Sequence, residues 1–387
     1  IIVTASVIMT VLNEARSIES TINKILEQIP KESEIVIIDA GSSDNTVGIL
    51  SNIAKRDNRV KYTQKPGVSR GLGRNVAITL CKNDIIISID AGCIPTDGWY
   101  EALIQPFKKP DSPDVVGGYW IPIYESIYGQ AVAKLTKPPL ANIKDSRFLP
   151  SSRCIAFKKK AWEAVGGYPD ENFGEDTFFD LALKKQGFKF EFVPSALVYW
   201  EQRNTLGGIK KQFFNYGLGS AKLGLIDSKK FASKLMILFS FLILCHYSWL
   251  IAGLTLIFIL IIMGIRPVRV PLKVFIAGLV TGIVIRASTL AGELYGTIKK
   301  INFEKFSLII FIIYFLFSII EKNEEYSNFQ LIYAPTLFIL LFYVNDNIKN
   351  KKINKSFSFF GRNSLYIFLL HFEILQSLYK YFNNLNI

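Results

Sequence analysis

The sequence has few cysteines, and they form none of the patterns found in metal sites or disulfide frameworks. The four cysteines, Cys81, Cys93, Cys154 and Cys245, are scattered over 387 residues. They show neither metal-ligand spacing nor paired spacing, so we expect reduced thiols in a cytosolic compartment. The chain starts at Ile1 without a methionine and shows no cleavable signal pattern, which is consistent with a missing true start.

Two further absences exclude classes of function. No Gly-x-Gly-x-x-Gly follows the first predicted strand, which excludes a redox enzyme of the Rossmann type. No basic segment interleaved with aromatic residues is present, so we expect no nucleic-acid partner. More than half of the net charge of +13 lies after residue 230, beside apolar stretches, where it is better suited to anionic lipid.

Long apolar stretches occur only in the second part of the chain. They cover residues 235–264, 274–285, 306–320, 331–344 and 365–378. The first is long enough to cross a bilayer and could form one tilted helix or a hairpin of two short helices. The flanking basic clusters slightly favour the hairpin. We therefore predict a catalytic-type domain over 1–230, membrane or interfacial helices over 231–300 and transmembrane helices over 301–387.

The first 230 residues alternate between strand and helix patterns. Apolar runs predict strands over 6–9, 35–38, 60–62 and 85–89, and amphipathic segments predict helices over 14–28, 44–55, 69–81 and 97–107. This order predicts an α/β fold with a mostly parallel sheet and helices on both faces. A less regular half follows, with late strands over 188–193 and 197–200. Asp44 is expected to cap the second helix.

Two predicted strands end in the same four residues. Ile38-Asp39-Ala40-Gly41 closes one apolar run and Ile89-Asp90-Ala91-Gly92 closes another. A carboxylate just past a buried parallel strand lies at the sheet edge where open α/β proteins bind ligands. The pair predicts a site for a nucleotide and its cation.

Five motifs in order over residues 4–225 resemble a family 2 glycosyltransferase. They are Asn13-Glu14, Asp39-x-x-Ser42-x-Asp44-x-Thr46, Gly71-x-Gly73-Arg74-Asn75-x-Ala77, Asp90-Ala91-Gly92-Cys93 and Gly174-Glu175-Asp176. The resemblance implies the GT-A fold in one Rossmann-like domain. It also implies a set of donor-binding residues: Asn13, Glu14, Asp39, Asp44, Arg70, Arg74, Asn75, Asp90, Ala91 and Gly92.

The residue types fit a sugar nucleotide. Asp39 is suited to accept a hydrogen bond from a base N–H, although a turn Asp that satisfies nearby amides is the alternative. Arg70 and Arg74 share one helical face and offer planar forks of donors for the base or the diphosphate, with a solvated helix face as the alternative.

The metal motif implied by the family is incomplete. Asp90 corresponds to the first acid of the Asp-x-Asp motif, while Gly92 replaces the second, which usually holds Mg²⁺ or Mn²⁺. Phosphates and waters supply ligands to Mg²⁺ readily, whereas the thiol of Cys93 suits softer metals. We therefore expect a divalent cation with Asp90 as its protein ligand.

The resemblance places the catalytic residues at the start of a helix over 176–185. Asp176 corresponds to the general base that takes the proton of the acceptor hydroxyl in inverting enzymes. Glu175 is expected as a helper. The alternative is that Asp176 only caps its helix.

The acceptor and diphosphate side is expected to include Arg153, Gly167, Tyr168 and Gln212. Polymer-making relatives carry Gln-x-x-Arg-Trp where this chain has Gln212-Phe213-Phe214-Asn215-Tyr216, which favours single transfer over processive synthesis. Trp200 is expected in the core rather than in the cleft.

The end of the chain shows a second resemblance. The segment Phe359-Phe360-Gly361-Arg362-Asn363 through His371 is similar to the final helix of type 3 membrane acyltransferases. The helices that carry that family's catalytic histidine have no counterpart here, so we expect a structural His371 and no acyl transfer.

We therefore predict a multi-pass membrane enzyme with its catalytic domain in the cytoplasm. It transfers sugar with inversion from a nucleotide-diphospho-sugar to a lipid-linked or cell-envelope glycan, in contact with membrane lipid. The alternative is a non-catalytic membrane scaffold with a degenerate nucleotide-sugar domain.

Overall fold

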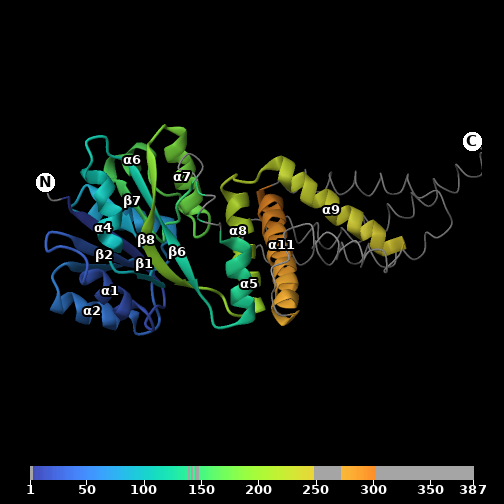
Figure 1. Cartoon of the computed structure of the whole chain (residues 1–387), viewed down its shortest axis with the longest axis horizontal. Helices are drawn as coiled ribbons and strands as arrows, with labels where there is room; N and C mark the ends of the chain where they lie inside the picture. The colour runs from blue at the N-terminus through green and yellow to red at the C-terminus, as the bar shows by residue number, and fades with distance from the viewer. Residues whose placement is uncertain (1–2, 138–139, 141–142, 144–147, 248–271, 301–387) are drawn as a thin grey trace, which may run out of the picture. The chain divides into compact units, whose positions relative to one another are not determined.

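The computed structural model of the chain describes residues 3–247 and 272–300, except for 138–139, 141–142 and 144–147 (Figure 1). The described residues belong to one compact unit, Ile1–Asn302. The predicted transmembrane helices after residue 300, the acyltransferase-like segment and His371 lie outside the described residues. The predicted domain boundary at residue 230 stays a prediction.

The first half of the sheet is parallel, as predicted. Its strands are β1 (Ala5–Val11), β2 (Glu34–Asp39), β3 (Val60–Gln64) and β4 (Ile85–Ser88). β1 pairs with β2 on one side and with β4 on the other, and β2 pairs with β3. The connecting helices are α1 (Ile18–Leu26), α2 (Thr46–Arg56) and α3 (Arg70–Leu80). Because β2 and β4 flank β1, the residues that follow both strands meet at one edge.

The second half of the sheet is mixed. Its strands are β5 (Cys93–Pro95), β6 (Val115–Ile123), β7 (Ile155–Lys158) and β8 (Phe190–Glu201), and the full order is β3-β2-β1-β4-β7-β6-β8-β5. β7 runs antiparallel to both β4 and β6, whereas β6 and β8 are parallel. The remaining helices of this half are α4 (Trp99–Ile104), the 3₁₀ helix η1 (Gln105–Lys108), α5 (Ile127–Thr136), α6 (Lys159–Ala164) and α7 (Glu175–Lys185).

The hydrophobic core has two layers, one on each face of the sheet. Val7 and Met9 of β1 belong to one layer, and Ile8 between them belongs to the other, as the alternation of a strand requires. The first layer includes α1, α2 and α4, whereas the second includes α3, α6 and α7. Helices therefore cover both faces, which confirms the sandwich of layers predicted from the βαβα order.

Two predicted details are wrong. The late strands predicted over 188–193 and 197–200 form the single strand β8. The N-cap of α2 is Asn45, whose side chain makes no capping hydrogen bond. The carboxylate of Asp44 nevertheless accepts a hydrogen bond from the amide of Thr46, the first residue of α2. The second error is a shift of one residue, because Asp44 is tied instead to the loop after β1.

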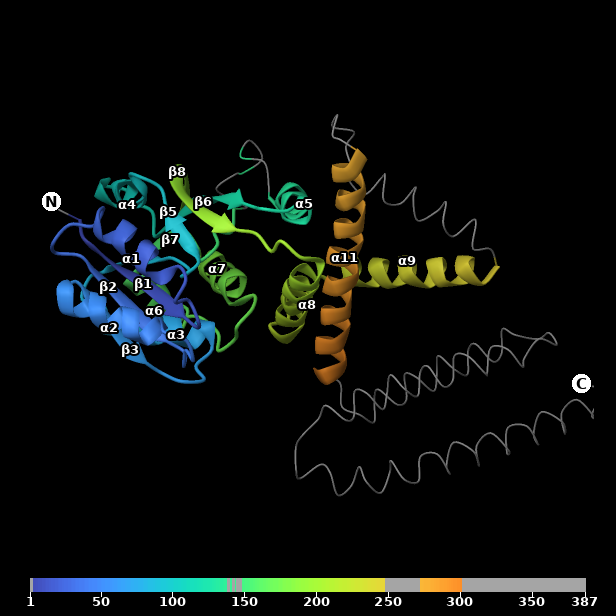
Figure 2. The ribbon, with the colours of Figure 1, turned by 90° about the horizontal axis from the view of Figure 1, so that it is seen from below.

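Within the described part of the chain, three long helices follow the sheet: α8 (Leu206–Lys222), α9 (Ser228–Tyr247) and α11 (Leu272–Lys300). Figure 2 shows α8 and α5 beside α11, and both pack against it. A Cβ atom at Gly217 of α8 would lie 2.1 Å from the carbonyl oxygen of Thr289, and one at Gly292 would lie 2.0 Å from that of Phe214. Glycine is therefore required for the close approach of the two helices.

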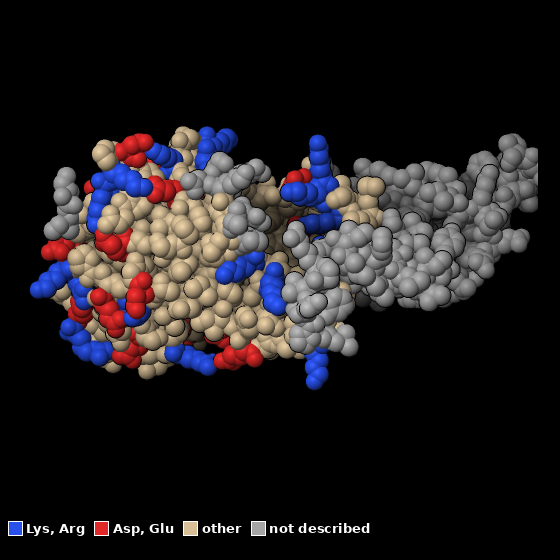
Figure 3. All heavy atoms as spheres, in the orientation of Figure 1, with Lys and Arg blue, Asp and Glu red and all other residues tan. Residues whose placement is uncertain are grey.

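One helix in the described part of the chain is long and apolar enough to cross a bilayer. It spans the 22 residues Ile276–Thr297 within α11. The predicted multi-pass arrangement rests on segments that mostly lie outside the described residues. On the face of the α/β part seen in Figure 3, acidic and basic side chains are interspersed rather than gathered into a patch of one sign.

Candidate active site

Asp39 and Asp90 lie at one edge of the sheet, as predicted from the repeated tetrapeptide. Val11 at the end of β1 is in register with Asp39, and the amide of Ile89 donates to the carbonyl of Ile8. The two carboxylates follow neighbouring strands on either side of β1. This edge is where an open α/β sheet binds its ligand.

The carboxylate of Asp39 is occupied by its own turn. Asp39 is 1% exposed, and its oxygens accept hydrogen bonds from the amides of Gly41 and Ser42 and from the Ser42 hydroxyl. These contacts are those of a turn-forming aspartate. Recognition of a base by Asp39 stays a prediction.

Asp90 is held by two guanidinium groups. Nη2 of Arg74 donates to Oδ1 of Asp90 at 2.8 Å, and Nε of Arg153 lies 3.6 Å from Oδ2. Burial alone would raise the pKa of Asp90, but the positive charges of Arg74, Arg70 and Arg153 outweigh it and hold the pKa below its ordinary value. Asp90 is therefore a carboxylate at neutral pH.

Arg74 is buried between two acids and does not face solvent. Its side chain is 2% exposed, its Nη1 donates to Glu175 at 2.7 Å, and its guanidinium lies over the ring of Tyr168. The contact of Arg74 with the base or diphosphate stays a prediction, while its guanidinium pairs with both Asp90 and Glu175. Arg70 is more exposed, and its Nη1 lies 3.9 Å from the carboxylate of Glu175.

Glu175 is buried and paired with Arg74, and the helper role expected for it stays a prediction. Its side chain is 3% exposed and its carboxylate is engaged by Arg74. Burial raises the pKa of Glu175, and Arg74 opposes that rise. The chain Glu175–Arg74–Asp90 ties the start of α7 to the end of β4.

Asp176 is the second residue of α7 and contacts Ser151. Gly174, with φ at +78°, ends the preceding loop in the left-handed region and starts α7. The Ser151 hydroxyl donates to Oδ2 of Asp176 at 3.4 Å, and the amide of Thr177 donates to Oδ1 at 2.8 Å. The helix-start role and an accessible carboxylate therefore coexist in this partly buried residue.

Arg153 occupies the middle of the site. Its guanidinium donates to the Ser151 hydroxyl at 2.8 Å and to the Tyr216 hydroxyl at 3.3 Å. It also stacks on the indole of Trp200, with 3.9 Å between Cζ and the ring centroid. Arg153 thereby links Asp90, through its Nε, to Asp176, through Ser151.

Sequence reasoning missed two of these contacts, those of Ser151 and Tyr216. Trp200 packs against the hydrophobic core, as expected, and its ring also contacts Arg153. The four-residue spacing of Gln212 and Tyr216 was the available signal, because it puts both on one helical face. Nε2 of Gln212 indeed donates to the Tyr216 hydroxyl at 2.9 Å.

Several expected donor-binding residues instead hold the loops of the edge together. Asn13 has a φ of +58°, and its Oδ1 accepts a hydrogen bond from the amide of Ser43. The amide of Glu14 donates a hydrogen bond to the hydroxyl of Thr46. Burial raises the pKa of Glu14. Asp44 accepts the amide of Ala15. These contacts fix the loop after β1 against the loop after β2.

The expected acceptor loop is fixed by Asn75. Its side chain bonds both the amide and the carbonyl of Tyr168, and its Oδ1 accepts from the indole of Trp162. A Cβ at Gly167 would lie 2.7 Å from Oδ1 of Asn75. Tyr168 is buried, with its hydroxyl 3.2 Å from that of Ser152. Asn75, Gly167 and Tyr168 therefore act as support for the site.

The residues at the end of β4 fit a divalent cation poorly. Asp90 supplies one carboxylate, and both its oxygens face guanidinium groups. The carbonyl of Ala91 accepts from Thr21, and a Cβ at Gly92 would meet no atom within 4 Å. The described residues contain no group of three or more His, Cys, Asp or Glu side chains that fits a metal ion.

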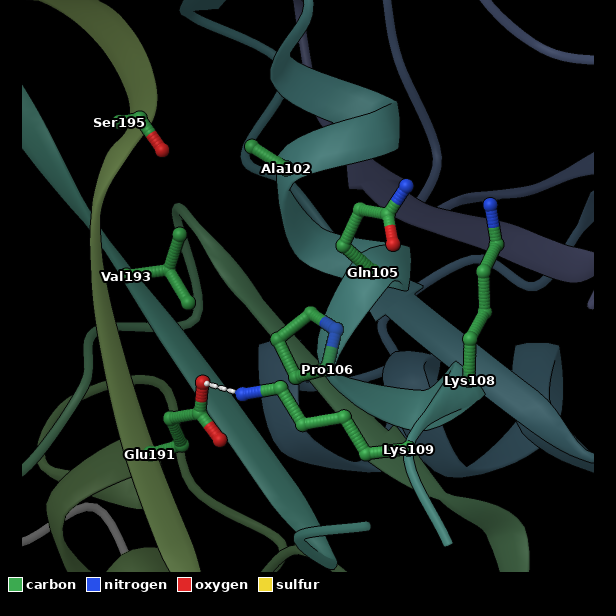
Figure 4. A pocket seen from close by; sticks show the side chains of 8 residues that line it. All are labelled: Ala102, Gln105, Pro106, Lys108, Lys109, Glu191, Val193 and Ser195. Carbon is green, nitrogen blue, oxygen red and sulfur yellow. Dashed lines mark hydrogen bonds and ion pairs between the residues drawn. The ribbon is translucent and has the colours of Figure 1, made fainter.

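A cavity of about 450 Å³ lies elsewhere and does not belong to this site (Figure 4). It is lined by Ala102, Gln105, Pro106, Lys108, Lys109, Glu191, Val193 and Ser195. Glu191 lies near the start of β8, whereas the site lies at the ends of the parallel strands. Lys109 pairs with Glu191 across the opening at 2.7 Å.

The chain matches models of known protein families and resembles characterised proteins. The family model described as Glycosyl transferase family 2 matches residues 6–162, and that described as Glycosyl transferase family group 2 matches residues 141–345. Succinoglycan biosynthesis protein ExoA of Rhizobium meliloti (strain 1021) is 28% identical over 228 residues, which are 56% of this chain and 68% of the relative.

Two further similarities concern a polymer synthase and the fold. The poly-beta-1,6-N-acetyl-D-glucosamine synthase of Staphylococcus aureus (strain COL) is 27% identical over 222 residues, 56% of this chain and 54% of the relative. The chain thus spans about half to two thirds of the length of these curated relatives. The mannosyltransferase PcManGT from Pyrobaculum calidifontis, solved in complex with GDP-Man and Mn²⁺, superposes with a TM-score of 0.52 at 17% identity, over 77% of this chain and 88% of that chain.

The similarity to PcManGT shows the fold, which fits the predicted GT-A class. The family matches cover the region where the motifs were recognised, and they favour an enzyme over a scaffold. They do not include an acyltransferase family, so the second resemblance stays a prediction. The second family model matches more than half of the chain, and the protein is therefore a glycosyltransferase of the family 2 group.

Proposed function

We propose that the enzyme transfers a sugar from a nucleotide-diphospho-sugar to a glycan acceptor with inversion at the anomeric carbon. The observation that carries this proposal is the placement of Asp176. Its carboxylate lies at the ligand-binding edge of the sheet, linked through Ser151 and Arg153 to Asp90. One base and one stabilised leaving group suffice for direct displacement.

In this reaction the acceptor hydroxyl attacks the anomeric carbon of the donor. Its proton passes to Asp176 as the new carbon–oxygen bond forms. The bond between the anomeric carbon and the phosphate oxygen breaks, and its electron pair leaves with the nucleoside diphosphate. The positive character that develops on the sugar resembles that in glycoside hydrolysis.

The donor is proposed to lie along the edge between Asp39 and Asp90. The loop fixed by Asn13 and Asp44 borders this edge, and Arg70 is the more exposed guanidinium beside it. The names of the similar synthases support a glycan acceptor. A lipid-linked or cell-envelope glycan fits the apolar second half of the chain, which we propose holds the enzyme at the cytosolic face of the membrane.

The predicted divalent cation is supported by the Mn²⁺ bound in PcManGT. The donor set of this chain does not fit such an ion, because the single carboxylate of Asp90 is already engaged by two guanidinium groups. No step above therefore depends on a metal.

Replacing Asp176 with Asn tests the assignment of the base. Asp176→Asn keeps the shape and the bond from Thr177 but cannot accept a proton, so we expect transfer to fall at least roughly 100-fold, within the range of general-base catalysis. Binding of a nucleoside diphosphate, measured by calorimetry, should stay within about threefold of the wild type, because Asn has the size of Asp and Asp176 is not among the proposed ligands of the diphosphate. Near-normal turnover in this variant would contradict the proposal.

A further inference from the structure

The implied metal motif lacks its second acid at Gly92, although the structure has space for an acidic side chain there. A side chain at Gly92 would meet no atom within 4 Å of its Cβ, so the absence of an acid there has no steric cause. Cys93, the next residue, is fully buried. Asp90 is therefore the one acid that this loop presents to a diphosphate.

The charge facing Asp90 is already positive. Arg74 lies 2.8 Å from one oxygen and Arg153 lies 3.6 Å from the other. Charges at such distances interact more strongly inside a protein than in water. A divalent cation beside Asp90 would meet this repulsion from both guanidinium groups, whereas a diphosphate would be attracted by them.

Arg153 is held rigidly and has an unused donor. Ser151, Tyr216 and the face of Trp200 fix the plane of its guanidinium. Its Nε is buried and makes no hydrogen bond within the described residues. An unsatisfied buried N–H next to a ligand site is costly unless a ligand completes it.

Tyr216 has a donor to spare as well. Its hydroxyl accepts from Gln212 at 2.9 Å and from Arg153 at 3.3 Å. A hydroxyl has two lone pairs and one proton, so both lone pairs are used and the O–H is left to donate to a third partner. The Nε–H of Arg153, which lies 3.6 Å from Asp90, and the hydroxyl of Tyr216, which bonds the same guanidinium, are thus two unused donors.

We propose that this enzyme transfers sugar without a bound divalent cation, and that Arg153 and Tyr216 stabilise the charge on the departing nucleoside diphosphate. This inference rests on the proposed function. As the bond to the anomeric carbon breaks, its electron pair remains on a phosphate oxygen. Nε–H of Arg153 and the hydroxyl of Tyr216 donate hydrogen bonds to the diphosphate. Neither residue gives up its proton.

Calorimetry on the full-length chain in detergent tests the metal first. The probes are UDP, GDP, CDP, ADP and dTDP, each titrated in EDTA and in Mn²⁺. For the nucleotide that binds, we expect dissociation constants in the two buffers to agree within about threefold, and transfer to persist in EDTA, because the protein supplies the counter-charge. Binding or transfer that is at least tenfold weaker in EDTA would overturn the inference.

Substitution of Arg153 tests the proposed stabilisation of the departing diphosphate. We expect Arg153→Gln to weaken nucleoside diphosphate binding by roughly 10- to 100-fold, the usual weight of charge-assisted hydrogen bonds, and Arg153→Lys to recover part of the loss. Arg59→Gln is the matched control, because Arg59 is similarly exposed and paired with Asp57 but lies before β3, away from the site. Wild-type affinity in Arg153→Gln would overturn the assignment.

The outcomes separate this inference from the function on which it rests. Binding that requires Mn²⁺ overturns the inference and leaves the glycosyl transfer intact. Failure of every nucleotide to bind in both buffers overturns the proposed donor and the inference together. Thermal unfolding shows whether Arg153→Gln folds. If it does not, the inference is judged by nucleoside diphosphate binding to Arg153→Lys and to the wild type in EDTA.

Discussion

Asp39 and Asp90 end identical tetrapeptides but meet different surroundings. Asp39 binds the amides of its own turn, while Asp90 binds guanidinium groups from α3 and from the loop before β7. The sequence placed both acids correctly at the strand ends, because a carboxylate after an apolar run is a local signal. The partners of Asp90 come from 16 residues and more away, so no local pattern specified them.

A buried acid next to the site has no role in the proposed reaction. Asp180 lies one turn after Asp176 on α7 and is 1% exposed. Its carboxylate has no hydrogen-bond partner within the described residues. Burial raises the pKa of Asp180 well above its ordinary value, the charge of Asp176 raises it further, and Lys184 opposes the rise.

This shift predicts a pH dependence of stability. Because the folded pKa of Asp180 exceeds the unfolded one, its stabilisation is complete below the unfolded pKa and is lost as pH rises through the folded pKa. Asp180→Asn stays neutral, so above that pH it should be more stable than the wild type by roughly 1–3 kcal/mol, with no difference in acid. Thermal unfolding from pH 4 to 9 measures this, with the exposed Asp97→Asn as control. Equal pH profiles for Asp180→Asn and the wild type would refute the prediction.

At the scale of elements, the strand β8 shows why the two late strands were predicted separately. Pro194 lies between their apolar runs and lacks an N–H for the ladder. Opposite it, the register with β6 jumps from Gly117↔Phe192 to Tyr119↔Leu197. An irregularity of this kind accommodates the proline within one continuous strand. Pairing with β6 joins the two apolar runs into one strand, and the local sequence does not encode that pairing.

The contact between α8 and α11 lies next to Tyr216 in the sequence of α8. Gly217 follows Tyr216 directly and touches the backbone of α11 at Thr289. The position of the Tyr216 hydroxyl therefore depends on how closely the two helices approach.

Adding one methyl group at Gly217 should separate the helices. We expect Gly217→Ala to lower the free energy of unfolding by roughly 1–3 kcal/mol, as overpacking does, and to slow transfer by displacing Tyr216. Gly278→Ala on α11 is the matched control, since its Cβ would meet no atom within 4 Å. It should be neutral or stabilise by up to about 1 kcal/mol. Equal stability and activity of the two variants would show that the close approach is unimportant.

For the whole molecule, the composition of the second half predicts attachment to a membrane. The apolar 22-residue segment of α11 and the excess basic charge after residue 230 support it. Expressed in full, the chain should stay with the membrane fraction after washes with 1 M salt and with alkaline carbonate, and should be released by detergent. Release by salt alone would contradict a spanning segment and indicate surface attachment.

The sequence by itself determined the family, the α/β class and the edge of the sheet that carries the site. These follow from local periodicity and from short motifs that can be recognised in the sequence alone. Only the tertiary structure decided which charges meet there: Arg74 between Glu175 and Asp90, and Arg153 between Asp90, Trp200 and Tyr216. The physical reason is that charge pairing depends on distance in space, and these residues come from α3, α7, α8 and the ends of three strands.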